Sequence, residues 1–344
     1  MHRGPLSLLS LLAACVLAAC VLAACALNAD LPPGRPVMLA APEPVVPHGG
    51  PCVEPPMADL TPFRHGRNRF FRKVGTPRFR GFDLIAAEDD PVQTLGGKLA
   101  YTAADSDVAG EDVHAYACFP EGWRLLGRTQ TGRDGRFELA LTGDERLPPG
   151  MRDLYAHVPG DRRGARFLAY VAPRGEAAVV TDVDGTLTES EDAILSTVLF
   201  GDDIGHQAYA PRALAIAAAG RPVIYLSSRG DQYTEVTRRW LAIHGFPTGP
   251  LRLARGAITK PGSSTVAFKA AALRALTIPI AAGLGNRASD VAAYARAGLP
   301  PARILIHVGD PELAREVGPE LAARRATPFR DYRQVPALLA RAAP

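Results

Sequence analysis

Residues 177–186 read Ala-Ala-Val-Val-Thr-Asp-Val-Asp-Gly-Thr. The apolar run from Ala177 to Val183 predicts a buried β-strand. Asp182 and Asp184 stand two residues apart where this strand ends, and Gly185 permits a sharp turn directly after them. Both carboxylates can therefore reach one site at the carboxyl end of the strand.

Strands and helices alternate from about residue 174 to the end of the chain. Further strands are expected at 223–226, 279–284 and 303–308, and helices at 213–219, at 233–244 and from Ser289 to a stop at Gly298. The second helix is expected to carry Val236, Trp240, Leu241 and Ile243 on its inner side. This alternation predicts an α/β fold over 174–344, a doubly wound parallel sheet with its ligand at the carboxyl ends of the strands.

A smaller all-β domain is expected before it, over 97–173. Apolar and polar residues alternate at 113–119 and 137–141, and Gly-Arg-Asp-Gly at 132–135 supplies a hairpin turn. Other short strands are expected at 123–131, 153–158 and 166–171. The pattern predicts a small antiparallel β-sandwich of immunoglobulin-like type, in which we find no catalytic constellation.

The first 25 residues have the form of an export signal. A short basic start leads into an apolar run that contains Leu-Ala-Ala-Cys three times, ending at Cys15, Cys20 and Cys25. This repeat resembles the lipobox of bacterial lipoproteins, which implies lipidation at Cys25 or Cys20 and an exported, membrane-anchored protein on the periplasmic or cell-surface side. An ordinary signal peptide is the alternative. Residues 26–62 are rich in proline and are expected to form a tether.

A basic and aromatic lead-in segment follows at 63–96. It allows two interpretations, contact with anionic lipid headgroups or packing of its phenylalanines on the domains with the arginines in solvent, and we favour packing. Cys52 and Cys118 can form a disulfide in an oxidising compartment, or remain two buried thiols. The 39 basic and 35 acidic residues leave a net charge of +4, too small to indicate a nucleic-acid partner. No protein partner is predicted.

Four groups of polar residues follow predicted strands and suit phosphoryl chemistry. Asp182 can attack phosphorus while Asp184 serves as acid and base. Ser227 can hydrogen-bond a phosphate oxygen, and Lys269 can offset its negative charge. Asn286 and Asp290, with Asp182 and Asp184, offer the oxygen ligands that Mg²⁺ prefers.

In this order the groups resemble the four motifs of the haloacid dehalogenase superfamily of phosphatases. The residues that carry the resemblance are Asp-Val-Asp-Gly-Thr-Leu-Thr at 182–188, Tyr-Leu-Ser-Ser-Arg at 225–229, Phe-Lys at 268–269 and Gly-Asn-Arg-Ala-Ser-Asp-Val at 285–291. Over about 174–330 they resemble the catalytic domain of lipins, the Mg²⁺-dependent phosphatidate phosphatases. The stretches 240–247 and 295–300 look still more like the C-terminal domain of RdgB/Nir phosphatidylinositol transfer proteins, which a similar sandwich also precedes.

The resemblance implies roles for the site residues. Asp182 is the expected nucleophile, Asp184 the acid/base, and Thr186, Ser227, Ser228, Arg229 and Lys269 the expected substrate-binding residues. Arg229 can instead form a salt bridge that fixes its loop. The fold is expected to be uncapped, which admits a headgroup at a membrane surface.

Three functions stay open at this point. The first is a Mg²⁺-dependent phosphatase of phosphatidate or a related phospholipid. The second is a phosphatidate-binding module without turnover, because the transfer proteins lack the nucleophilic aspartate that Asp182 supplies here. The third is a phosphatase of a soluble phosphoester. An acidic rim at Glu189, Glu191 and Asp192 departs from the lipin pattern and leaves the substrate in question.

Overall fold

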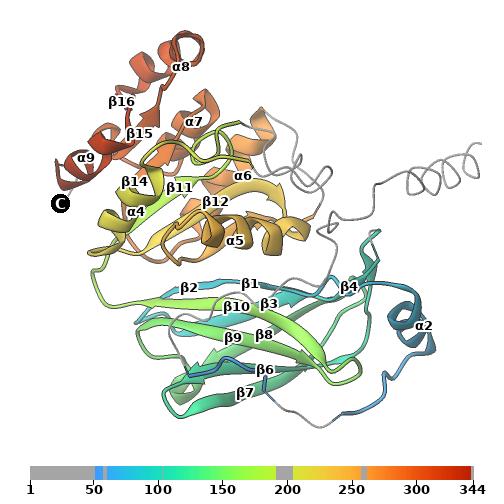
Figure 1. Cartoon of the computed structure of the whole chain (residues 1–344). Helices are drawn as coiled ribbons and strands as arrows, with labels where there is room; N and C mark the ends of the chain where they lie inside the picture. The colour runs from blue at the N-terminus through green and yellow to red at the C-terminus, as the bar shows by residue number, and fades with distance from the viewer. Residues whose placement is uncertain (1–50, 57–59, 103, 191–203, 257–261, 342–344) are drawn as a thin grey trace, which may run out of the picture. The chain divides into compact units, whose positions relative to one another are not determined.

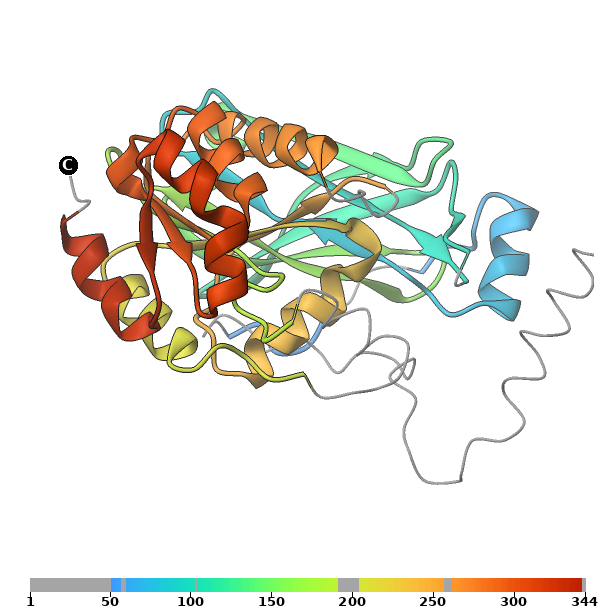
Figure 2. The same ribbon diagram turned by 90° about the horizontal axis from the view of Figure 1, so that it is seen from above.

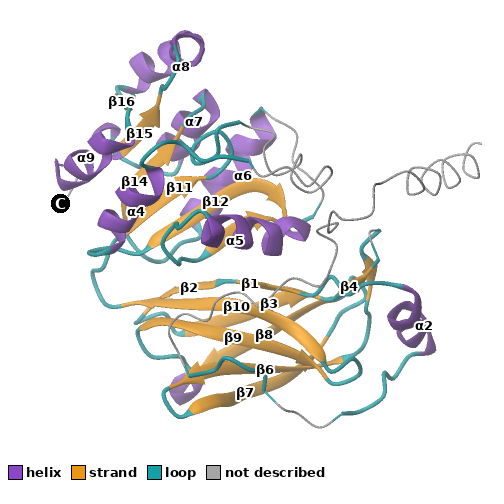
Figure 3. Cartoon of the chain, in the orientation of Figure 1, coloured by secondary structure: helices purple, strands orange, loops and turns teal. Residues whose placement is uncertain are grey.

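The computed structural model describes residues 51–56, 60–102, 104–190, 204–256 and 262–341 (Figure 1). The expected lipidation sites Cys20 and Cys25, and rim residues Glu191 and Asp192, lie outside these ranges. Within them the predicted fold class is confirmed. A small β-sandwich is followed by a parallel sheet with helices, and the change from mainly strands to mixed strands and helices is plain in Figure 3.

The sandwich consists of two sheets and a short ladder. The three-stranded sheet has the order β1–β3–β8 and the five-stranded sheet the order β2–β10–β9–β6–β7. All pairs are antiparallel except β2 with β10. The strands are β1 (Arg80–Phe82), β2 (Leu84–Ala87), β3 (Val92–Lys98), β6 (Asp112–Phe119), β7 (Gly122–Gln130), β8 (Arg136–Thr142), β9 (Gly150–Val158) and β10 (Arg163–Ala172), and the ladder pairs β4 (Ala100–Tyr101) with β5 (Ser106–Asp107). The expected alternation is visible in β6, where Val113, Ala115 and Ala117 are buried.

The sandwich begins earlier than the expected boundary at residue 97. Strands β1, β2 and most of β3 lie inside the segment 63–96. Gly81 explains why β1 is hard to see in the sequence. A Cβ atom there would lie 2.1 Å from the Phe167 ring, so close packing requires a residue with poor strand propensity.

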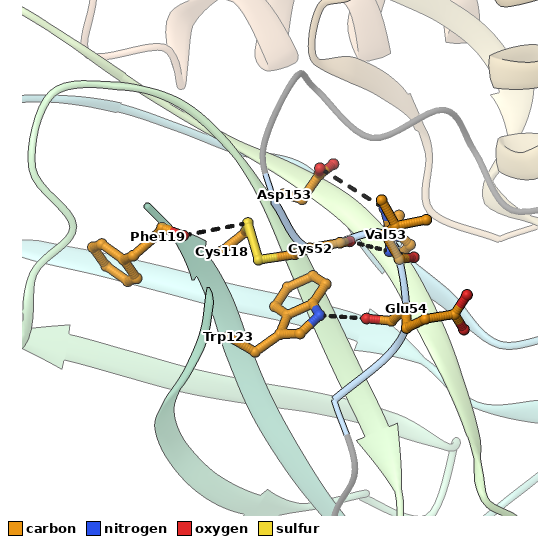
Figure 4. The surroundings of a disulfide bond; sticks show 8 residues. Cys52, Val53, Glu54, Cys118, Phe119, Trp123 and Asp153 are labelled. Atoms are coloured by element: carbon orange, nitrogen blue, oxygen red, sulfur yellow. Dashed lines mark hydrogen bonds and ion pairs between the residues drawn. A yellow bond between two sulfur atoms is a disulfide. The ribbon is translucent and has the colours of Figure 1, made fainter. Parts of the chain in front are cut away.

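A disulfide joins Cys52 to Cys118 at the end of β6, with their Cα atoms 5.9 Å apart (Figure 4). Neighbouring bonds fix the same segment to the sandwich. Trp123 Nε1 donates to the Glu54 carbonyl oxygen at 2.6 Å, and Arg166 Nη2 donates to the carbonyl oxygens of Cys52 and Val53 at 2.8 Å. Of the two alternatives that the sequence leaves open, the structure contains the disulfide.

The second domain is built on a six-stranded, wholly parallel sheet. Its order is β13–β12–β11–β14–β15–β16, with β11 near the centre. The strands are β11 (Ala178–Asp182), β12 (Val223–Gly230), β13 (Leu251–Ala254), β14 (Ile280–Gly285), β15 (Ile304–His307) and β16 (Thr327–Phe329). Burial on both faces explains the continuous apolar runs in β11 and β15.

Helices cover both faces of this sheet (Figures 1 and 2). One face packs on α4 (Ala210–Ala218), α5 (Thr234–Ile243) and α9 (Val335–Arg341), and the other on α6 (Ser263–Arg274), α7 (Ala288–Arg296) and α8 (Pro311–Arg324). Trp240 and Leu241 of α5 are buried as expected, but the expectation for Ile243 is wrong. That residue is 63% exposed at the end of the helix, whereas Leu241 in the same turn is buried.

Two buried carboxylates bridge the sandwich and the parallel-sheet domain. Asp83, between β1 and β2, accepts from Arg238 Nη2 of α5 at 2.8 Å and from the Leu251 amide at 2.6 Å. Asp231, directly after β12, accepts from Arg80 Nη2 at 2.8 Å and Arg136 Nη2 at 2.9 Å. The two domains are therefore joined by hydrogen-bonded ion pairs.

Candidate functional site

The polar residues that follow β11, β12 and β14 gather at one edge of the sheet. β11 pairs with β12 on one side and β14 on the other, so Asp182 ends a strand flanked by the strands that carry Ser227 and lead to Asn286. Parallel strands bring their carboxyl ends to the same edge. Gly185 has a φ of +66°, the left-handed conformation that lets the chain turn there.

The expectation that Lys269 follows a strand is wrong, because this residue belongs to helix α6. From this helix Lys269 lies between two carboxylates in the interior of the site. Its Nζ is 2.5 Å from Asp182 Oδ1 and 2.6 Å from Asp290 Oδ1, and all three side chains are at most 5% exposed. Burial disfavours the ammonium, but the two carboxylates outweigh it, so the pKa of Lys269 lies above its ordinary value. Burial raises the pKa of Asp182 to about 7 against the attraction of Lys269. Lys269 therefore neutralises part of a dense negative charge.

Thr186 connects Asp182 to Asn286. Its Oγ1 lies 3.1 Å from Asp182 Oδ2 and 3.0 Å from Asn286 Oδ1. The hydroxyl has one proton and can donate it to only one of these oxygens. The corner between Asp182 and Asn286 is consequently rich in oxygen acceptors.

Asp290 and Asp184 face other partners. Asp290 Oδ2 accepts from the amides of Asn286 and Arg287 at 3.0 Å, which holds the loop after β14 in place. Asp184 accepts from Ser227 Oγ at 2.8 Å and Arg229 Nε at 2.7 Å, and Arg229 Nη2 also contacts it. Arg229 thus forms the salt bridge that the sequence offers as an alternative to phosphate binding.

The predicted metal ligands partly share one corner. Among the described residues, no group of three or more His, Cys, Asp or Glu side chains is placed to hold a metal ion. Asp182 and Asn286 are joined through Thr186, whereas Asp290 is engaged by Lys269 and backbone amides, and Asp184 by Arg229. Mg²⁺ commonly takes one or two carboxylates and completes its shell with water and substrate phosphate, so the oxygens of Asp182 and Asn286 fit this ion.

A cavity of about 570 Å³ opens beside this corner. It extends from Gly185 and Asn286 to a polar wall that includes Arg287, Arg330 and Glu316. Its volume is typical of small-molecule sites. A small molecule has room here.

Sequence reasoning missed two residues at this edge. Tyr332 donates its hydroxyl to the Thr186 carbonyl oxygen from 146 positions away, and so fixes the loop that follows β11. His307 lines the cavity, is 5% exposed and packs its ring against Phe329 and Tyr332. No motif marks either residue, but both lie at or just after the carboxyl end of the sheet. Ser228 lies on β12 between Ser227 and Arg229 and is partly buried.

Both domains match family models that come from a single type of protein. Residues 179–308 match the model of the LNS2 domain of PITM 1-3, and residues 78–171 match the model of its β-sandwich domain. The two domains resemble those of PITM proteins. The sandwich match starts at 78 and therefore agrees with the early strand β1.

The similar proteins are far longer than this chain. Human membrane-associated phosphatidylinositol transfer protein 2 is 30% identical over 248 residues, which cover 69% of this chain and 17% of that protein. Human membrane-associated phosphatidylinositol transfer protein 3 is 29% identical, over 69% of this chain and 24% of that protein. Nuclear elongation and deformation protein 1 of Schizosaccharomyces pombe is 28% identical, over 48% and 29%. The chain thus spans less than a third of the length of each.

Proposed function

We propose that this protein is a Mg²⁺-dependent phosphatase that hydrolyses the phosphomonoester of a phosphatidate-like phospholipid. One observation carries the proposal. Asp182 ends the central strand beside Lys269, with Asp184 two residues later and an oxygen-rich corner at Thr186 and Asn286. This arrangement provides a nucleophile, an acid/base and a cation site in one place.

Each side chain has a defined task in this reaction. An oxygen of Asp182 forms a bond to phosphorus as the ester bond breaks, and Asp184 gives its proton to the leaving oxygen. Asp184 then takes a proton from water, which attacks the aspartyl-phosphate and frees Asp182. Asp184 must first part from Arg229, whose guanidinium can then pair with the phosphate. Bound Mg²⁺ would neutralise the charge of the carboxylates and phosphoryl group.

The relatives support a phospholipid substrate. The names of the human proteins describe membrane-associated transfer of phosphatidylinositol, so phospholipid is the class of ligand that those proteins handle. The cavity beside Asn286 has room for a glycerol group attached to the phosphate.

A binding module without turnover is the second candidate function. The names of the relatives favour it, because they describe transfer and not hydrolysis. The ion pair between Arg229 and Asp184 also favours it, since it keeps the expected acid/base away from a leaving group. Asp182 favours hydrolysis, because transfer proteins of the resembled type lack this nucleophile.

Phosphate release from vesicles distinguishes the two functions. The full chain is mixed with phosphatidylcholine vesicles containing phosphatidate, or with a soluble phosphoester, in Mg²⁺ or in EDTA. We expect the protein to release phosphate from phosphatidate in Mg²⁺ and not in EDTA. In Asp182→Asn the rate of release should fall at least about 10³-fold, because the covalent pathway is removed. Asp144→Asn, an exposed carboxylate on the sandwich, is the matched control and should keep full activity.

Three outcomes contradict the phosphatase proposal or its substrate. Metal-dependent turnover that survives in Asp182→Asn would reject the assigned nucleophile. Binding of phosphatidate without phosphate release would favour the second function. Turnover of the soluble ester alone would reject a lipid substrate.

We further propose that the protein works outside the cytoplasm, anchored by an acylated cysteine. The disulfide between Cys52 and Cys118 supports this location, because such bonds persist in oxidising compartments. Mass spectrometry of the mature protein tests the proposal. An acylated N-terminal Cys20 or Cys25 is expected, and an unmodified residue at the mature N-terminus would contradict it.

A further inference from the structure

The helix α2 (Gly66–Val74) presents an unusual surface. It contains Arg67, Arg69, Arg72 and Lys73 and no acidic residue. Two large apolar side chains on it face solvent, Phe70 at 58% exposure and Val74 at 60%. Figures 1 and 2 both show α2 clear of the other helices.

The opposite side of α2 is fixed to the sandwich. Asn68 is buried, and its Nδ2 donates to the Ala109 carbonyl oxygen at 2.9 Å and to Glu111 Oε1 at 2.7 Å. Arg72 Nη1 donates to the Gly160 carbonyl oxygen at 2.8 Å, and Phe71 packs against the sandwich core. These contacts hold the helix in one orientation, with Phe70 and Val74 outward.

The outward side combines apolar and basic groups. Phe70 and Val74 are four residues apart, so they are neighbours on the helix surface. Lys73 and Arg69 flank them on one side and Arg67 on the other, as the 100° turn per residue requires. Arg69 and Lys73 form no ion pair among the described residues, so their charge is available to an anionic partner.

We propose that α2 docks on the surface of an anionic phospholipid bilayer, with Phe70 and Val74 inserted between headgroups. A basic rim around an apolar centre matches a surface that is negatively charged outside and apolar beneath. A polyanion such as nucleic acid would pair with the basic side chains of α2 but leave Phe70 and Val74 in water. No helix in the described part of the chain has the length and apolar character needed to cross a bilayer.

This docking is independent of the proposed phosphatase. It uses none of the residues at the carboxyl edge of the parallel sheet. With this docking, both interpretations of the lead-in segment, packing and lipid contact, apply to different residues of it. Phe63 and Phe79 pack in the core as favoured there, whereas Phe70 remains exposed for lipid.

Depth measurement at position 70 tests the proposal directly. A nitroxide is attached to Phe70→Cys in the full chain, with Cys15, Cys20 and Cys25 replaced by serine so that no acyl chain contributes. Vesicles contain phosphatidylcholine with phosphatidylglycerol, a phosphodiester that offers the active site no phosphomonoester. We expect the label to gain contact with dissolved oxygen and lose contact with an aqueous nickel complex. The same label at Ile243→Cys on α5 should stay in water.

Vesicle binding supplies the second measurement. The double variant Phe70→Ser, Val74→Ser should lower the partition coefficient at least about tenfold, because the apolar insertion is lost. Arg69→Gln with Lys73→Gln should remove the preference for anionic vesicles. Ile216→Ser, which removes an exposed apolar side chain from α4, is the matched control and should bind like the parent.

The outcomes separate docking from catalysis. Hydrolysis of phosphatidate presented in neutral detergent micelles should be unchanged in the α2 variants, and vesicle docking should be unchanged in Asp182→Asn. A label at position 70 that stays in water on anionic vesicles would overturn the proposal. If Arg69→Gln with Lys73→Gln lowers binding to vesicles and to heparin equally, and the label at position 70 stays in water, α2 would be a binding site for polyanions instead.

Discussion

Lys269 is the residue on which the electrostatics of the site depend. It places one positive charge between the buried carboxylates of Asp182 and Asp290. Two carboxylates this close repel each other unless a cation separates them. In the proposed reaction the same ammonium also attracts the phosphoryl oxygens, so that stability and substrate binding would depend on one side chain.

Replacing Lys269 by methionine should destabilise the fold. Two buried carboxylates would lose their partner, and breaking a buried ion pair typically costs about 3 to 5 kcal/mol. The free energy of unfolding, measured by urea titration, should fall by about that amount. Arg324→Met breaks an exposed pair with Glu320 on α8 and should change it by less than about 1 kcal/mol. Equal effects of the two variants would contradict the role assigned to Lys269.

Which residues meet in the site could be predicted, but not how they pair. Their positions after successive parallel strands brought Asp182, Ser227 and Asn286 to one edge. The partners depend on side-chain rotamers and backbone turns that periodicity does not encode. Asp290 therefore faces backbone amides, and Asp184 faces Arg229.

At the level of elements, the helices α4, α5 and α7 were predicted, whereas the longer helices α6 (Ser263–Arg274) and α8 (Pro311–Arg324) were not. The helix expected at 233–244 is α5 (Thr234–Ile243), and the strand expected at 303–308 is β15 (Ile304–His307). The short strands β13 and β16 escaped prediction, because three or four residues carry too little pattern. Strand β1 escaped it because Gly81 weakens the strand signal.

The first turn of α5 contains a carboxyl group in an unusual state. The Glu235 Oε1 atom is buried and has no hydrogen-bond partner among the described residues. Burial raises the pKa of Glu235 to about 7, Arg238 opposes this, and Asp83 adds to it. The helix N-terminus favours a negative charge, but here burial outweighs that effect.

Glu235 should make stability depend on pH. Because its pKa is higher in the folded state than in the unfolded one, its contribution is fully present below about pH 4.5 and is lost as the pH rises to about 7. Glu235→Gln should therefore stabilise the protein at pH 8, by about 3 kcal/mol, and have little effect at pH 4. Urea titrations at both values measure this. Glu312→Gln in the exposed first turn of α8 is the control, and an effect of Glu235→Gln that does not vary with pH would refute the assignment.

On the scale of the whole described body, the sandwich and the parallel-sheet domain meet next to the segment that carries Ser227 and Arg229. Asp231 follows Arg229 by two residues and is held by Arg80 and Arg136 of the sandwich. Asp83 and Arg238 make a second buried pair. These partners are 95 to 155 residues apart in the chain, so no local pattern could have indicated them. The sandwich therefore supports the segment that carries Ser227 and Arg229.

Loss of Asp231 should uncouple the two domains. Asp231→Ala would leave Arg136 and Arg80 without the carboxylate that joins them to η2 (Asp231–Tyr233), at a cost of about 3 to 5 kcal/mol. Calorimetry should then show two unfolding transitions where the parent shows one, because domains joined weakly unfold separately. Asp134→Ala removes an exposed carboxylate 3.5 Å from the same Arg136 and should keep the parent's transition. One unshifted transition in Asp231→Ala would mean that apolar contacts such as Ile85 and Tyr170 with Ile278, and not the ion pairs, couple the domains.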